Sequence, residues 1–156
     1  MGLIAQKFDR IRCVPKPYQL IIDTNVLVSG LRSPRGASYQ MLSRLKDDRW
    51  QINLSVPLIL EYETLLTRES ANPNLDRPTI DCILDNICAI TNHHKIFYVW
   101  RPVAKDPNDD FLIDLALKAQ ADYIITYNQK DLIPSTQRFG LQVVNPKEFL
   151  QIVGDI

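Results

Sequence analysis

The chain has 156 residues, of which 46% are hydrophobic, and this length suits one domain that buries a core without disulfides or a structural metal. Its 18 Lys and Arg residues balance its 18 Asp and Glu residues, so net charge does not indicate a polyanionic partner, and contact with nucleic acid requires a local basic patch or metal ions. The three cysteines, Cys13, Cys82 and Cys88, are odd in number and widely spaced, which argues against a disulfide framework or a zinc site and favours a reducing compartment.

The first residues carry no sign of export or membrane attachment. Residues 1–7 lack the long apolar core of a signal peptide, and Gln6 stands where a myristoylation signal requires Ser or Thr. No apolar run approaches the length that crosses a bilayer. We therefore expect a cytoplasmic protein without a membrane partner, with an N-terminal arm over residues 1–17 and a single domain over residues 18–156.

The first strand is predicted at Gln19–Ile22, where aliphatic side chains follow one another as in a strand covered on both faces. Asp23 ends this run, and Thr24 and Asn25 favour a turn and a helix start. Asp23 is therefore expected at the carboxyl end of a central strand, where open α/β sheets bind their ligands.

Strands and helices are predicted to alternate along the rest of the chain. This pattern favours a three-layer α/β/α fold with a central, mainly parallel sheet of about five strands and right-handed crossovers. The further strands are predicted at residues 50–54, 95–100, 123–126 and 141–144. The helices are predicted at residues 26–31, 37–46, 55–68, 80–90 with Thr79 as the N-cap, 111–117, and from Pro146 onward.

An acid lies within the apolar face of the helix that follows Ser55. Leu58, Tyr62 and Leu65 form a stripe at helical spacing, and Glu61 falls on the same face. Two interpretations are equally open: a residue at the edge of the stripe that reaches solvent or an arginine, or a functional acid.

Two more groups of acidic and polar residues lie beside predicted elements. Three acids precede the helix at 111–117: Asp106, Asp109 and Asp110. A helix N-cap needs one acid, so capping does not account for all three. Thr126 ends the fourth predicted strand, and Asn128 and Asp131 follow it, which repeats the design of the first: an apolar strand, a hydroxyl, a polar side chain and an acid. If the first and fourth strands are neighbours, these groups meet Asp23 at one end of the sheet.

Several carboxylates close together repel one another unless they share protons or bind hard cations. Mg²⁺ or Mn²⁺ is the expected ion, because the chain offers carboxylates and no Cys or His cluster. A metal held in this way lowers the pKa of a bound water, so we predict metal-assisted phosphodiester hydrolysis. Four cations are candidates for phosphate binding: Arg32, Arg35, Lys105 and Lys130. The alternative is that they are ordinary surface residues.

Four segments resemble the PIN-domain family in the same order, and the resemblance runs from about Tyr18 to Phe149. They are residues 21–29, 55–68 with Glu61, 106–112 and 126–132. The similarity is greatest to the bacterial members that are toxins of toxin–antitoxin pairs. It implies a Mg²⁺- or Mn²⁺-dependent endoribonuclease that cuts single-stranded or structured RNA, has a cognate antitoxin protein, and forms a homodimer or higher oligomer.

The same resemblance implies roles for single residues. Asp23, Glu61 and Asp110 match the metal-binding acids of the family. The polar residues that orient them match Thr24, Asn25 and Thr126, and Asp106 and Asp109 are candidates for outer ligands. Many relatives have Asp at the position of Asn128, whereas others keep Asn there and an Asp three residues later, as Asp131 is here.

Two other function classes remain as alternatives. Asn128 is a weaker, uncharged ligand, which favours a catalytically weak or inactive PIN-like scaffold that binds RNA or protein. A phosphoacceptor signalling domain has a related fold, but it requires two acids after the first strand, and this chain has one.

Overall fold

The structure, a computed structural model, describes residues 15–68, 75–96 and 107–156, with side chains in the last range described from Asp110 onward. These residues form one five-stranded sheet in the order β3-β2-β1-β4-β5, in which every pair of neighbours is parallel. The strands are β1 (Tyr18–Ile22), β2 (Trp50–Ser55), β3 (Asn92–His94), β4 (Tyr123–Ile125) and β5 (Gln142–Val144).

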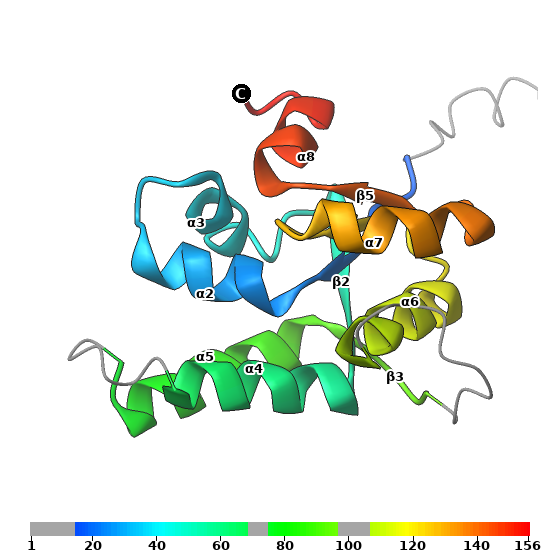
Figure 1. Ribbon diagram of the computed structural model, residues 1–156. Coiled ribbons are helices and arrows are strands. Elements are labelled where there is room, and N and C mark those ends of the chain that lie inside the picture. Colours follow the sequence, from blue (N-terminus) through cyan, green and yellow to red (C-terminus); the bar gives the residue numbers. More distant parts are fainter. Residues whose placement is uncertain (1–14, 69–74, 97–106) are drawn as a thin grey trace, which may run out of the picture.

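Helices cover both faces of the sheet (Figure 1). The described helices are α2 (Thr24–Arg32), α3 (Ala37–Leu42), α4 (Val56–Arg68), α5 (Arg77–Ile90), α6 (Pro107–Ala119), α7 (Gln129–Thr136) and α8 (Pro146–Ile152), with a short 3₁₀ helix, η2 (Gln137–Phe139). The predicted three-layer α/β/α fold with a parallel sheet of about five strands is confirmed.

Side-chain alternation along β1 assigns its residues to the two halves of the core. Ile21 packs with residues of α4, α5 and α6, whereas Leu20 and Ile22 pack with residues of α2, α3 and α8. All three side chains are at most 3% exposed, as expected for a strand with helices on both faces. β1 is therefore the central strand, and its carboxyl end opens between the two helical layers.

The third strand differs from its prediction over residues 95–100. It is Asn92–His94, while residues 97–100 lie outside the described residues. The polar side chain of His94 is accommodated because its Nε2 lies 2.8 Å from Oδ1 of the buried Asn53, on the neighbouring strand. A pattern of apolar residues does not reveal such a partner.

Three helical details also differ from their predictions. The N-cap of α5 is Asp76, whose side chain accepts a hydrogen bond from the Thr79 backbone N–H, and Thr79 is not the cap. Helix α3 ends at Leu42 rather than at residue 46. The buried stripe of α4 continues through Leu66 rather than Leu65.

The predicted boundary between an arm and the domain is only partly covered by the structure. Residues 15–17 are exposed and have no regular structure, and residues 1–14 lie outside the described part. Within the described ranges, no helix has the length and apolar character needed to cross a membrane.

Candidate functional site

Asp23 lies at the junction between β1 and α2. It is the N-cap of α2, and its Oδ1 accepts a 2.7 Å hydrogen bond from the Thr24 backbone N–H. Its Oδ2 accepts hydrogen bonds from the Thr126 hydroxyl at 2.6 Å and from the Asn25 amide at 3.3 Å. The carboxylate is thus oriented from two neighbouring strand ends, because β4 pairs with β1, which is the condition that the sequence left open.

Asn25 and Thr126 join the loops after β1 and β4 into one network. Asn25 Nδ2 donates to Thr126 Oγ1 at 3.3 Å, and Asn25 Oδ1 accepts from the Tyr127 backbone N–H at 3.3 Å. Thr126 Oγ1 also accepts from the Asn128 backbone N–H at 2.9 Å. Both ends of the Asn25 amide are in use, so its orientation toward Asp23 is determined by its partners.

Glu61 reaches the same corner of the sheet from α4. Thr24 Oγ1 donates to Glu61 Oε2 at 3.0 Å, so Thr24 contacts Asp23 through its backbone and Glu61 through its side chain. The next residue, Tyr62, is buried, and its hydroxyl donates to the carbonyl of Ile22 at the end of β1. Glu61 is therefore connected to Asp23 through Thr24.

Burial of the site raises the pKa values of two of its ionisable groups, Asp23 and Tyr62. Burial raises the pKa of Asp23 above its ordinary value of 3.8, and the hydrogen bonds from Thr126 and Thr24 offset only part of this increase. Burial also raises the pKa of Tyr62 well above 10.0, with further contributions from the negative charges of Asp23 and Glu61. In the described part of the chain, no Lys or Arg forms an ion pair with Asp23.

Helix α6, which packs against β1 and α4, carries two further acids whose side chains the structure describes. Asp110 is half-buried in its N-terminal part, and Asp114 lies one turn later on the same face. One carboxylate oxygen of Asp114, Oδ2, is buried without a hydrogen-bond partner in the structure. Burial, followed by the charge of Asp110, raises the pKa of Asp114.

Asp114 was not singled out from the sequence as a site residue. The available signal was its spacing of four residues from Asp110, within the apolar run of residues 111–117. Its buried, unpartnered oxygen is a group that a cation or a bound water would satisfy.

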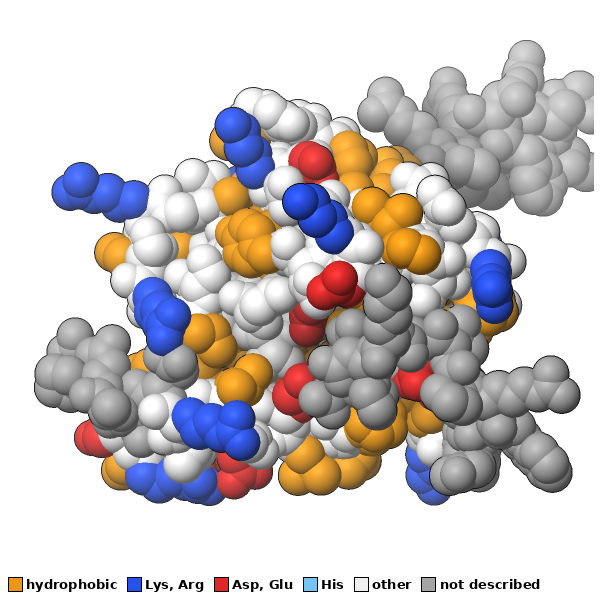
Figure 2. Space-filling view, in the orientation of Figure 1, with side chains coloured by type: hydrophobic (Ala, Val, Ile, Leu, Met, Phe, Trp, Pro, Cys, Tyr) orange, Lys and Arg blue, Asp and Glu red, His pale blue; other side chains and the backbone are white. Residues whose placement is uncertain are grey.

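The remaining predicted site residues are less closely connected to Asp23. Asp131 and Lys130 are exposed in the first turn of α7, Asn128 precedes that helix, and Arg32 and Arg35 are exposed at and after the end of α2. Lys105, Asp106 and the side chain of Asp109 lie outside the described residues. Figure 2 shows acidic side chains near the centre of this face of the molecule, with Lys and Arg side chains at several points around them.

The donor chemistry of the site fits a hard divalent cation, because Asp23, Glu61, Asp110 and Asp114 offer only carboxylate oxygens. The predicted gathering of acids is only partial, however. Among the described residues, no group of three or more acids, His or Cys lies close enough together to hold one metal ion.

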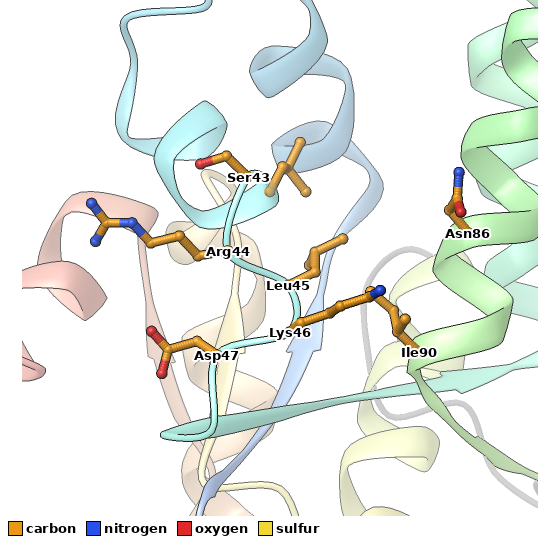
Figure 3. A pocket seen from close by; sticks show the side chains of 8 residues that line it. Ser43, Arg44, Leu45, Lys46, Asp47, Asn86 and Ile90 are labelled. Atoms are coloured by element: carbon orange, nitrogen blue, oxygen red, sulfur yellow. The ribbon is translucent and has the colours of Figure 1, made fainter.

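A hollow of about 490 Å³ lies elsewhere, between the segment after α3 and helix α5 (Figure 3). Lys46 extends toward Ile90 of α5, whereas Arg44 and Asp47 point toward α8. Arg44 pairs with Asp155 at 2.7 Å and Asp47 with Arg49 at 2.6 Å, so two of the three charged residues that line the hollow already have ion-pair partners. None of the predicted site residues lines this hollow.

Comparison with protein families gives a match to the PIN domain over residues 19–130. The chain belongs to the PIN-domain family. The matched range starts in β1, ends early in α7, and contains Asp23, Glu61, Asp110 and Thr126. The family thus covers the whole corner of the sheet described above.

Among solved structures, the PIN domain of this chain is similar to the crystal structure of VapBC2 from Rickettsia felis bound to a DNA fragment from their promoter. The identity is 14%, the TM-score is 0.53, and the match covers 81% of this chain and 98% of that chain. This similarity supports the fold. No protein among the curated sequences compared matches the chain.

The burial of Asp23 leads to a prediction about stability. Because the folded protein holds the Asp23 proton more tightly than the unfolded chain, this carboxyl group favours folding most below pH 3.8, and the contribution is lost as pH rises through the raised pKa. We expect Asp23→Asn to have a higher Tm than the wild type at pH 7 in EDTA, with the difference shrinking as pH falls toward 4. Thermal unfolding followed by circular dichroism measures both quantities.

The matched control is Asp48→Asn, which removes an exposed acid. Its difference in Tm from the wild type should stay small across this pH range. Two results would contradict the account in which burial opposes the charge of Asp23. The Asp23→Asn variant could have a lower Tm than the wild type at pH 7, or its difference in Tm from the wild type could be the same at pH 4 and pH 7.

Proposed function

We propose that the protein is a metal-dependent endoribonuclease that hydrolyses RNA phosphodiester bonds. The observation that carries this proposal is the placement of Asp23. It is a buried carboxylate that pairs with no Lys or Arg of the described residues, at the carboxyl end of the central strand of a PIN domain, with Glu61 connected to it through Thr24. Such a carboxylate is costly unless a proton or a cation compensates it.

The residues that would hold Mg²⁺ or Mn²⁺ are Asp23, Glu61 and Asp110. When bound, the ion supplies a water of lowered pKa and an electrostatic partner for the attacked phosphate. The protein's own contribution is orientation: Thr126 and Asn25 direct one oxygen of Asp23, and Thr24 directs Glu61. Asp106 and Asp109 are proposed as outer ligands, and Asp131 as a fourth acid that compensates for Asn128.

The proposed substrate is RNA, whose phosphates would contact Arg32, Arg35, Lys105 and Lys130. We further propose that the protein acts in the cytoplasm as the toxin of a toxin–antitoxin pair, with a cognate antitoxin protein and a homodimeric or higher assembly. The resemblance of the four motifs to bacterial toxins and the similarity to the fold in the VapBC2 structure support this part.

A second candidate function is a PIN-like scaffold that binds RNA or protein without efficient catalysis. Two observations favour it: Asn128 stands where many relatives have an acid, and the described acids do not form a group of three at metal-binding distance. The two functions differ in their need for metal.

The nuclease proposal predicts that Asp23→Asn abolishes RNA cleavage while the protein stays folded. Cleavage of a labelled single-stranded RNA pool in the presence of Mn²⁺, resolved by gel electrophoresis, measures the loss, and Asp48→Asn serves as the control that retains activity. Isothermal titration of Mn²⁺ should give binding heat for the wild type and much less for Asp23→Asn. Cleavage by Asp23→Asn at the wild-type rate refutes the proposed role, and a wild type that neither binds Mn²⁺ nor cleaves RNA supports the scaffold.

The hydrogen bond from Thr24 to Glu61 leads to a separate prediction. Thr24→Val keeps the shape of a buried side chain and removes the hydroxyl that directs Glu61. We expect its affinity for Mn²⁺ to fall by about tenfold, as is typical when a group that orients a ligand is lost. The control is Thr64→Val on α4, because that exposed hydroxyl bonds only to its own helix, at the carbonyl of Leu60. Equal affinities for the two variants would show that Glu61 does not need Thr24 for metal binding.

A further inference from the structure

Tyr127 is an exposed aromatic residue at the rim of the candidate site. Its side chain is 48% exposed, although it directly follows Thr126, which contacts Asp23. Its backbone N–H donates to the side chain of Asn25, which also contacts Asp23. The backbone of Tyr127 is therefore connected to the acid through both of the polar residues that orient it.

The far end of the Tyr127 ring is also held. Its hydroxyl lies 2.5 Å from the hydroxyl of Ser38, in a hydrogen bond to a residue of α3 that is only 1% exposed. An exposed tyrosine normally moves between rotamers, and binding a ligand then costs conformational entropy. Here the hydrogen bond fixes the ring in advance, so that stacking on it costs less.

Other exposed aromatic residues in the described part lack this combination. Tyr18, Tyr39, Phe111 and Phe139 are 37%, 43%, 42% and 43% exposed, but no hydrogen bond in the described part of the chain holds the tip of any of these rings. Phe139 also lies in η2, after the end of α7, whereas Tyr127 precedes that helix. Tyr127 thus combines exposure, rigidity and a direct connection to the candidate catalytic acid.

We propose that the ring of Tyr127 stacks on an unpaired nucleobase of the RNA substrate beside the scissile phosphodiester. This inference rests on the proposed nuclease function and narrows its substrate class to RNA that is single-stranded at this position. Every base offers a π face to an aromatic side chain, so stacking selects an accessible base before it selects a sequence. A base inside a duplex is covered on both faces by its neighbours and is not available to the ring.

The test uses the full chain with Asp23→Asn, to prevent turnover, and three RNA probes of twelve nucleotides. These are a labelled single strand, the same strand with tetrahydrofuran residues in place of its bases, and a blunt duplex. Fluorescence anisotropy with Mn²⁺ present throughout gives the Kd of each probe. The variants added to this background are Tyr127→Leu and Tyr127→Phe, with Phe139→Leu as the control that removes an equally exposed ring.

We expect Tyr127→Leu to weaken binding of the single strand by about ten- to a hundredfold, the range measured for loss of one stacked base. Binding of the abasic strand should not change, because it has no base to lose. Tyr127→Phe keeps the ring and loses the bond to Ser38, so its affinity should stay within roughly threefold. Phe139→Leu should match the parent on every probe.

The outcomes separate this inference from the function on which it rests. If neither the Asp23→Asn parent nor the wild type in Ca²⁺ binds a probe, the RNA-directed function fails and the stacking role fails with it. If only the wild type binds, the Tyr127 variants are compared in the wild-type chain in Ca²⁺. Two results overturn only the stacking role, provided that the parent binds the single strand. In the first, Tyr127→Leu binds the single strand as tightly as the parent; in the second, Tyr127→Leu lowers the affinity for the abasic strand by the same factor as the affinity for the single strand. A loss confined to the probe that contains accessible bases establishes it.

Discussion

The structure around the candidate site depends on one costly arrangement, a carboxylate buried at the point where the central strand becomes a helix. Asp23 receives hydrogen bonds from Thr24, Asn25 and Thr126, which orient it but do not cancel its charge. Because burial raises its pKa, the folded protein pays for the ionised form at neutral pH. A divalent cation would remove this penalty, which connects the local energetics of the fold with the proposed chemistry.

The sheet order makes this arrangement available from segments far apart in the sequence. Pairing of β1 with β4 places Thr126 against Asp23, and the packing of α4 against α2 brings Glu61 to the Thr24 hydroxyl. The same loop after β4 presents Tyr127, whose hydroxyl bonds to Ser38 on α3. One corner of a parallel sheet thus combines an acidic centre, which would face a phosphate backbone through a bound cation, with an aromatic ring on which an unpaired base can stack.

Much of the fold and part of the site could be predicted from residue patterns, and the failures share a cause. The aliphatic run before Asp23 and the alternation of strands with helices were sufficient for the α/β/α class, because burial on both faces leaves a direct mark on a sequence. β3 was misplaced because His94 is accommodated by Asn53, a partner 41 residues away. Asp114 and Tyr127 were not recognised for a similar reason. The unpartnered oxygen of Asp114 and the hydrogen bond between the hydroxyls of Tyr127 and Ser38 exist only in the folded chain.

The central claim is that Asp23, Glu61 and Asp110 act together on one divalent ion. A crystal structure of the protein soaked in Mn²⁺, with the ion located by its anomalous scattering, tests this claim most directly. We predict a Mn²⁺ peak bonded to Asp23 at about 2.1–2.3 Å, with carboxylate oxygens of Glu61 and Asp110 bonded directly or through one water. A crystal saturated with Mn²⁺ in which Asp23 keeps only its three hydrogen-bond donors, and the metal is absent or bound elsewhere, would contradict the account.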